Sequence, residues 1–296
     1  MTFTIVLLLL ACMLCNAIPN TIKKSYKKNT PIFFTSVCIC FSLLFFVVKF
    51  LIENKGFNFS VDIGILKYAI PFGICFATTS VFTYLAFKLG DLSLTGLLTS
   101  FSLLIPTFYG ILFLGDDVGL FFYLGLALFI TCLVLTNVKF LDKDKEKEKK
   151  PVSIKWVICV LVGAVANGGC SLIQTMQQKA YGGKGGSELM IIALTFALVA
   201  LLIVAFCIER DRLKDAYKSA LALGFPCGVL VGCLNALVMV FTGQNLLPVS
   251  VFFPLHAGGV LLITFVFGYF FYKDRYDWLQ YVGLFCGVAS VIMLNL

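Results

Sequence analysis

Two stretches that repeat the same sparse lettering decide the fold of this chain. Residues 110–137 read GILFLGDDVGLFFYLGLALFITCLVLTN, and residues 268–295 read GYFFYKDRYDWLQYVGLFCGVASVIMLN. The shared positions lie 158 residues apart without a gap: Gly110, Phe113, Asp116, Tyr123, Gly125, Leu126 and Asn137, then Gly268, Phe271, Asp274, Tyr281, Gly283, Leu284 and Asn295. Because duplicated halves of membrane proteins commonly meet around a binding site at mid-membrane depth, the repeat points to transport.

The composition requires a membrane. The chain of 296 residues is 60% hydrophobic and 13% charged, with a mean hydropathy of +1.00, whereas a soluble domain carries about 25% charged residues. A helix needs roughly 20 apolar residues to cross the hydrocarbon core. Ten such spans are predicted, at 2–20, 31–51, 66–88, 92–114, 118–138, 155–176, 189–207, 218–242, 247–271 and 277–296. Runs that are apolar on nearly every face, such as residues 41–48, exclude the alternating pattern of a β-barrel.

The first span has a second interpretation, because residues 9–12 resemble a lipoprotein cleavage box and residues 1–17 a secretory signal. Such signals begin with positive charge, and residues 1–15 carry no charged side chain. Removal of this span would also leave the first repeat one helix short. We therefore expect a retained helix.

The two halves are predicted to form an inverted repeat in an all-α membrane protein of ten transmembrane helices. Residues 141–150, LDKDKEKEKK, cannot bury apolar surface and are expected to be a solvated linker. This gives a first five-helix repeat at 1–139, a linker at 140–154 and a second five-helix repeat at 155–296. Five is an odd number, so the second half enters the membrane from the opposite side. Weaker matches at a spacing of 155 pair Cys15 with Cys170, Lys24 with Lys179, Tyr26 with Tyr181, Pro71 with Pro226 and Gly73 with Gly228.

Basic residues predict the orientation. Of the 23 Lys and Arg residues, 18 fall in the odd-numbered connections and the other 5 in the even-numbered connections and adjoining helix ends. By the positive-inside rule the odd-numbered connections face the cytoplasm, and both termini lie outside. This bias also explains the net charge of +8, so we expect no nucleic acid as a partner.

Polar residues inside the spans are the candidate substrate-binding residues, because a polar group in the bilayer is costly unless it is paired or lines a cavity. The candidates are Asn16, Ser80, Thr99, Asn167, Ser171, Gln174, Asn235 and His256. Ser and Thr often bond their own helix carbonyls, whereas Asn and Gln satisfy themselves less easily. His256 is the only histidine and lies between Pro254 and Gly258-Gly259, where it could titrate, bind a ligand or pack as a neutral ring.

No acidic residue lies at the middle of a predicted span. Since proton-coupled carriers often use a buried carboxylate, this favours a facilitator or exchanger of neutral or weakly charged solutes. Proton coupling would need His256 or an acid at the end of a span. Hydrolase and nucleotide-binding motifs are missing, so we expect no enzyme and no catalytic residue. The 12 cysteines are expected to behave as small apolar residues, and we predict no metal site and no cofactor.

The pattern resembles the drug/metabolite transporter superfamily, specifically its EamA-like ten-helix branch. The resemblance rests on an acidic turn followed by a glycine-bearing helix in each half: residues 114–117 (LGDD) and 123–125 (YLG), then 272–275 (YKDR) and 281–283 (YVG). Residues 251–259 (VFFPLHAGG) are similar to the family's ninth helix. Members usually carry Glu in the turn, where this chain has Asp116 and Asp274. Members are generally described with both termini in the cytoplasm, which is opposite to the charge count.

The resemblance implies alternating access around a cavity enclosed by the first, third, fourth, sixth, eighth and ninth spans. It places the fifth and tenth spans at the periphery, against lipid or a second copy of the chain in a homodimer. The leading prediction is a multi-pass secondary transporter of the plasma membrane, a bacterial inner membrane, for a small-molecule solute such as an amino acid or related amphiphile. Two alternatives stay open: a lipid-linked sugar flippase of the same superfamily, and a non-transporting membrane sensor or assembly protein.

Overall fold

A computed structural model of the chain describes residues 3–55, 62–89, 95, 99, 101–116, 119–137, 154–272 and 278–293. All regular secondary structure in these ranges is helical, as the sequence predicts. The α-helices are α1 (Phe3–Ser25), α2 (Pro31–Asn54), α3 (Ile63–Leu89), α5 (Leu104–Phe113), α6 (Leu120–Asn137), α7 (Ile154–Ala180), α8 (Gly186–Ile208), α9 (Leu213–Gly243), α10 (Val249–Tyr272) and α11 (Trp278–Met293), and the short 3₁₀ helices are η1 (Phe101–Leu103) and η3 (Arg210–Arg212).

Six of these ten α-helices, namely α1, α2, α3, α7, α8 and α9, are long and apolar enough to cross a membrane. The helices α5, α6, α10 and α11 contribute shorter apolar stretches within the described residues. Hydrocarbon offers no hydrogen bonds, and a helix satisfies its own N–H and C=O groups. The chain is therefore a multi-pass membrane protein. Of the fourth predicted span, 92–114, the structure describes Thr95, Thr99 and the stretch from η1 to Leu114.

The helix α9 begins earlier than the sequence predicts. The expected span starts at residue 218, whereas α9 starts at Leu213. Its first two turns carry Lys214, Asp215 and Lys218, all exposed. Charged side chains end a span that is predicted from hydropathy, but they do not end a helix whose first turns lie outside the hydrocarbon.

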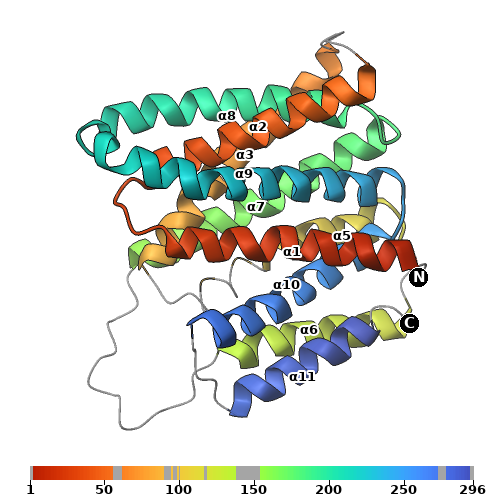
Figure 1. The fold of residues 1–296 in the computed structure, drawn as a ribbon. Coiled ribbons are helices and arrows are strands. Elements are labelled where there is room, and N and C mark those ends of the chain that lie inside the picture. The colour runs from red at the N-terminus through yellow and green to blue at the C-terminus, as the bar shows by residue number, and fades with distance from the viewer. Residues whose placement is uncertain are drawn as a thin grey trace.

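The helices lie side by side in one bundle (Figure 1). The helices α2 and α8 pack together near one edge, and α6 and α11 pack on each other at the opposite edge. Between these edges α3 packs on α7, and α1 packs on α9. The helix α10 contacts α1 and α5 and also borders the α6–α11 pair. The fifth and tenth predicted spans, which are α6 and α11, thus lie at the periphery.

Helix contacts recur between the two halves of the chain. Each helix of the first half has a counterpart in the second: α1, α2, α3, α5 and α6 correspond in order to α7, α8, α9, α10 and α11. When every helix is replaced by its counterpart, the contact of α3 with α7 becomes the contact of α9 with α1, which the structure also contains. The same exchange turns α2 on α9 into α8 on α3, and α1 on α10 into α7 on α5. Each half therefore meets the other through matching sets of helices.

One of these matching contacts is made by a pair of glycines. A Cβ atom added at Gly73 of α3 would lie 2.7 Å from the carbonyl oxygen of Ala193 in α8. A Cβ atom added at Gly228 of α9 would lie 2.3 Å from the carbonyl oxygen of Cys38 in α2. Gly73 and Gly228 are 155 residues apart, and so are Cys38 and Ala193. Glycine is needed at both places because the helix backbones approach too closely for a side chain.

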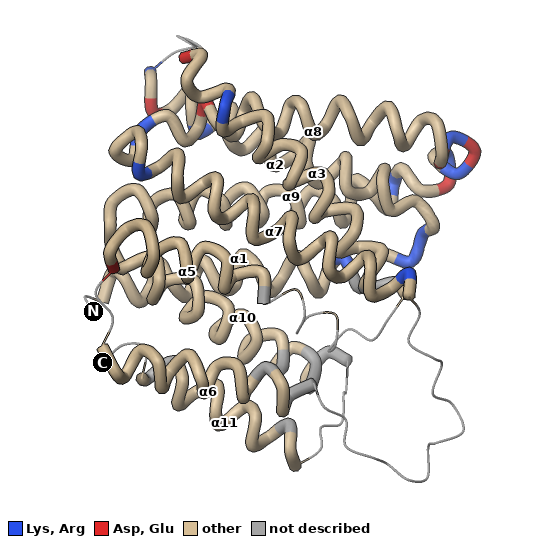
Figure 2. The backbone as a smooth tube through the Cα atoms, turned by 180° about the vertical axis from the view of Figure 1, so that it is seen from behind, with Lys and Arg blue, Asp and Glu red and all other residues tan. Residues whose placement is uncertain are grey.

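Charged residues gather at the two ends of the bundle and are sparse between them (Figure 2). This is the distribution expected when the middle of the bundle lies in lipid. The first turn of α1 and the last turn of α11 lie on the same side of the bundle (Figure 1).

Candidate functional site

The crossing of α1 and α10 brings two predicted site residues together. Asn16 Nδ2 lies 3.5 Å from His256 Nε2, and Asn20 Nδ2 donates a hydrogen bond to Asn16 Oδ1 at 3.3 Å. Asn16 and Asn20 are half-buried, whereas His256 is only 3% exposed. The imidazole stacks on Phe252 with ring centroids 5.9 Å apart. Asn20 thus contacts Asn16, Asn16 contacts His256, and the buried His256 ring packs against Phe252.

A second polar crossing joins α7 to η1. Asn167 Nδ2 donates a hydrogen bond to Ser102 Oγ at 2.7 Å. A Cβ atom added at the neighbouring Gly168 would lie 2.6 Å from the Ser102 carbonyl oxygen. The first crossing is equally close, since a Cβ atom added at Gly259 of α10 would lie 2.2 Å from Met13 Sδ of α1. Met13 and Gly168 are 155 residues apart, so the two crossings correspond in the repeat.

Gln174 and Asn235 meet between α7 and α9, but through the backbone. Gln174 is buried, and its Nε2 donates to the Asn235 carbonyl oxygen at 3.0 Å. The half-buried Asn235 donates from Nδ2 to the carbonyl oxygen of Val231 at 2.8 Å. Asn235 therefore bonds its own helix in the way that Ser and Thr often do.

The predicted hydroxyl residues are more dispersed. Thr99 Oγ1 donates to the carbonyl oxygen of Thr95 at 2.9 Å, which is a bond within its own helical turn. Ser80 on α3 and Ser171 on α7 are half-buried, on two helices that pack together. Among the described residues, no hydrogen bond joins these three side chains to one another.

Sequence reasoning missed a buried contact between α3 and α7. Thr79 Oγ1 donates to the carbonyl oxygen of Gly163 at 3.0 Å, and Thr83 Oγ1 lies 3.4 Å from Thr79 Oγ1. Asn20 was also not predicted. Each missed residue has a polar neighbour one helical turn away, so a search for polar residues at i, i+4 spacing within apolar spans would have found them.

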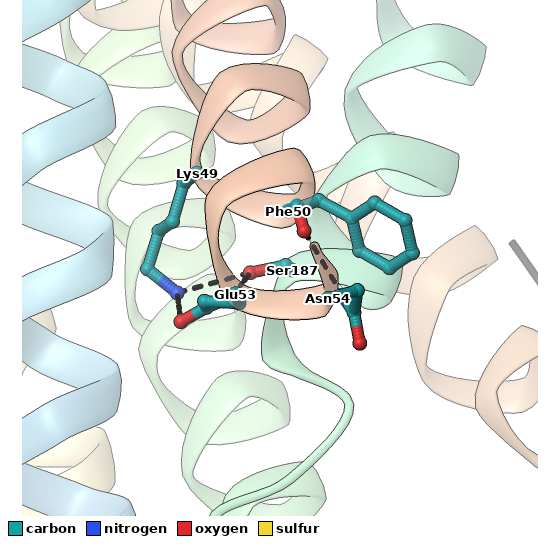
Figure 3. Close-up of polar contacts among 5 residues, drawn as sticks. All are labelled: Lys49, Phe50, Glu53, Asn54 and Ser187. Carbon is teal, nitrogen blue, oxygen red and sulfur yellow. Dashed lines mark hydrogen bonds and ion pairs between the residues drawn. The ribbon is translucent and has the colours of Figure 1, made fainter. Parts of the chain in front are cut away.

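A charged cluster fastens α2 to α8 at one end of the bundle (Figure 3). Lys49 Nζ lies 2.6 Å from Glu53 Oε1 and donates to Ser187 Oγ at 3.0 Å. Ser187 Oγ in turn donates to Glu53 Oε2 at 2.8 Å. Ser187 is buried in the first turn of α8. An ion pair of the first half is thereby hydrogen-bonded to a hydroxyl of the second half where α2 ends and α8 begins.

The two crossings present amide, hydroxyl and imidazole groups without a formal charge among their described partners. Such groups donate to and accept from neutral polar atoms of a solute. In the ranges that the structure describes, no group of three or more His, Cys, Asp or Glu residues could hold a metal ion. The arrangement suits binding of a neutral or weakly charged molecule.

The helical spans and the polar crossings between halves define a polytopic helical membrane protein. Residues 154–296 match the EamA-like transporter family, so the second half of this chain is an EamA-like domain of the drug/metabolite transporter superfamily. The chain is also similar to a solved structure titled only "Crystal structure of protein", at 12% identity and a TM-score of 0.70. That likeness covers 96% of this chain and 98% of the other. No curated protein matches the sequence.

The family resemblance inferred from the acidic turns is thus confirmed for residues 154–296. The likeness to the solved structure shows a shared fold over nearly the full length of the chain. The match of residues 154–296 to this family suggests a transporter of a small molecule, and proteins of the family are typically not enzymes.

Proposed function

We propose that the protein is a secondary transporter that moves a small organic metabolite, an amino acid or related amphiphile, by alternating access. The observation that carries this proposal is the pair of polar crossings, Asn16 with His256 and Asn167 with Ser102. Each joins a helix of one half to an element of the other, so movement of one half against the other must change both. A site between two moving halves is what alternating access requires.

The proposed architecture is an inverted repeat of residues 1–139 and 155–296. Its support is the recurrence of helix contacts under exchange of the halves, and the matched approach of Gly73 to Ala193 and of Gly228 to Cys38. The predicted linker, 140–154, lies almost wholly outside the described residues.

The proposed substrate contacts begin with the half-buried amides. Asn16, Asn167 and Asn235 are partly accessible, while Gln174 and His256 are buried. Ser80, Thr99 and Ser171 complete the proposed set with hydroxyls that can supply a second hydrogen bond. A polar group of the solute would replace one partner in each crossing, so binding would loosen the contact between halves.

The proposed location is the plasma membrane, a bacterial inner membrane, with the odd-numbered connections in the cytoplasm. The peripheral α6–α11 pair is the surface on which lipid or, in a homodimer, a second copy would lie. A cysteine added after Leu296 tests the orientation. A membrane-impermeant thiol reagent should label it in intact cells above the level of the unmodified chain, and labelling only after lysis would reverse the orientation.

Transport is tested with purified protein in two steps. A thermal-shift screen against a metabolite library identifies solutes that bind, and uptake of these solutes is then measured in proteoliposomes. Asn16→Ala, Asn167→Ala and His256→Ala should abolish both the shift and the uptake. Thr131→Ala is the matched control, because Thr131 is on the peripheral helix α6 and bonds only its own turn, to Ala127 at 2.8 Å. Binding and uptake that survive all three substitutions would contradict the site.

The alternatives predict other results. A flippase would translocate lipid-linked sugars and not the soluble metabolites. A sensor or assembly protein would bind without uptake of any solute.

A further inference from the structure

The contact between Asn16 and His256, with the amide orientations that the structure assigns, specifies a protonation state of the imidazole. Asn20 donates to Asn16 Oδ1, so the Asn16 amide nitrogen is the atom directed at His256 Nε2. An amide nitrogen can only donate, so Nε2 must be the acceptor and carry no proton. His256 is then neutral, with its hydrogen on Nδ1. Among the described residues, the buried Nδ1 makes no hydrogen bond of normal geometry, although the backbone of Cys12 lies close enough to interact with the ring.

Protonation would break this contact. An imidazolium donates from both nitrogens, so an N–H at Nε2 would oppose the N–H of Asn16. The charge would also be enclosed at a residue that is 3% exposed and stacked on Phe252, in a crossing where Met13 of α1 closely approaches Gly259 of α10. A buried charge without a partner is strongly unfavourable. The protonated ring is therefore compatible only with an arrangement in which α1 and α10 separate and admit water.

No carboxylate near the ring offers compensation. The described titratable groups on helices in contact with α10, away from the charged helix ends, are Cys12 and Cys15 of α1, Tyr109 of α5, Tyr123 and Cys132 of α6, Cys227 and Cys233 of α9, and Tyr281 and Cys286 of α11. These are thiols and phenols, and none of them is a carboxylate. The described charged groups lie at the ends: Asp116 at the first turn of α10, Lys23 near the end of α1, and Lys214, Asp215 and Lys218 at the start of α9.

The corresponding crossing in the other half has no such group. Asn167 meets Ser102, whose hydroxyl does not titrate in this pH range. Acid can therefore loosen the crossing of α1 with α10 while the crossing of α7 with η1 keeps its hydrogen bond. Because protonation would weaken only one of the two crossings, it would favour one arrangement of the halves over the other.

We propose that His256 is a proton-binding site whose protonation opens the crossing of α1 and α10. Its use in coupling transport to a proton gradient rests on the proposed function, but the response to pH does not. The proton comes from water that enters the opened crossing and returns there when the ring is buried again. One bound proton changes the ratio of open to closed protein by at most about tenfold per pH unit.

The test uses hydrogen exchange of the full chain in lipid nanodiscs at pH 7.5 and 5.5, with labelling times adjusted for equal intrinsic exchange. Peptides of α1 around Asn16 and of α10 around His256 should exchange faster at the lower pH, by up to about tenfold per pH unit. Peptides of α7 around Asn167 should not change. His256→Gln retains an acceptor oxygen but cannot titrate, so it should lose the response. Ser102→Ala, at the corresponding crossing, should keep it.

A second measurement uses the wild-type chain and does not depend on the folding of a variant. Because the chain has one histidine, selective ¹⁵N-histidine labelling of protein purified through a histidine-free tag gives one ring to observe. At pH 7.5 it should be neutral with hydrogen on Nδ1, and protonated signal should grow together with the faster exchange. A ring that stays neutral at pH 5.5, or exchange that responds equally in His256→Gln, overturns the proposal. Uptake without a pH response would overturn only the proton site, whereas a pH response without uptake of any solute would overturn only transport.

Discussion

Glu209 and Glu53 lie at opposite ends of the α2–α8 pair, each at the first turn of the other helix. Glu209 follows α8 and accepts hydrogen bonds from the backbone N–H groups of Ile32 at 3.0 Å and Phe33 at 2.8 Å in α2. Glu53 lies in the last turn of α2 and accepts from the Ser187 hydroxyl of α8 at 2.8 Å. Ile32 and Ser187 are 155 residues apart, so the two contacts correspond in the repeat. They differ in burial, because Glu209 is 4% exposed and the Glu53 side chain is 49% exposed.

This difference predicts unequal effects of removing the two carboxylates. Glu209→Ala should lower the free energy of unfolding by about 2 to 4 kcal/mol, since it leaves two N–H groups of a helix start without acceptors in a buried place. Glu53→Ala should cost less than about 1 kcal/mol, because its ion pair with Lys49 is open to solvent. Unfolding in mixed micelles, followed by tryptophan fluorescence, measures both. Equal losses of unfolding free energy in Glu209→Ala and Glu53→Ala would contradict the argument that burial makes the Glu209 contacts more stabilising.

Asp116 gives the repeated Gly-Asp lettering a structural reason. Its Oδ2 accepts from the backbone N–H and from the hydroxyl of Ser250, both at 2.9 Å, at the start of α10. Gly110 makes the room, because a Cβ atom there would lie 2.6 Å from Asp116 Oδ2 and 2.8 Å from Ser250 N. An acid of the first half of the chain thus caps a helix of the second half. The counterpart Asp274 lies outside the described residues.

Removal of this cap should be graded. Asp116→Ala should destabilise by about 1 to 2 kcal/mol, as expected for a lost helix cap. Ser250→Ala should cost about half as much, because the backbone N–H keeps its bond to Asp116. In a double variant the two losses should be less than additive, since both substitutions remove the same hydroxyl contact. Additive losses would mean that the two side chains act separately.

The sequence predicted the helical fold well because a bilayer leaves few choices. Apolar runs of sufficient length must be helices, and their ends follow the charged residues closely. The paired Pro-Gly positions were also predictable, and Gly73 and Gly228 occupy matched contacts. The early start of α9 was not predictable from hydropathy, because Lys214 and Asp215 are polar and yet helical.

The candidate site was predicted by residue type but not by partner. Asn16 and Asn167 stand out as amides inside apolar spans, but their partners depend on which helices cross. Asn16 and His256 are 240 positions apart, and nothing local relates them. Glu209 was missed for another reason. An acid in a charged connection is expected to be solvated, and only the fold places it against the start of α2.

Tyr26 makes stability depend on alkaline pH. It lies between α1 and α2, where burial, together with the nearby Glu209, raises the pKa of its phenol, partly opposed by the hydrogen bond to Thr30. An unfolded tyrosine loses its proton near pH 10. The stabilisation is therefore complete below about pH 10 and is lost as the pH rises through the higher pKa of the folded state.

The matching experiment compares unfolding at pH 8 and pH 11. Tyr26→Phe should reduce the loss of stability between these values, whatever its effect at pH 8. Tyr217→Phe, at a residue that is 45% exposed, is the control for the removal of a phenol hydroxyl. If Tyr26→Phe leaves the change in unfolding free energy between pH 8 and pH 11 unaltered, groups other than Tyr26 cause the loss of stability at alkaline pH.

The matched glycines allow the closest test of the contacts between halves. Gly228→Ala would force a Cβ atom to within 2.3 Å of the Cys38 carbonyl oxygen, and Gly73→Ala to within 2.7 Å of that of Ala193. Each oxygen belongs to a helix backbone, so relief requires a shift of α2 or α8 as a whole. Overpacking of this kind typically costs about 1 to 3 kcal/mol, and we expect the larger loss at Gly228.

Gly119→Ala is the control for both, because nothing lies within 4 Å of an added Cβ atom there. It should change stability by less than about 0.5 kcal/mol. Because the two glycine contacts lie between different pairs of helices, their losses should add in the double variant if each acts locally. A loss smaller than the sum would indicate that one shift of the halves relieves both contacts, which is the behaviour expected of two rigid halves that move against each other. A neutral Gly228→Ala would contradict the close approach of α9 to α2.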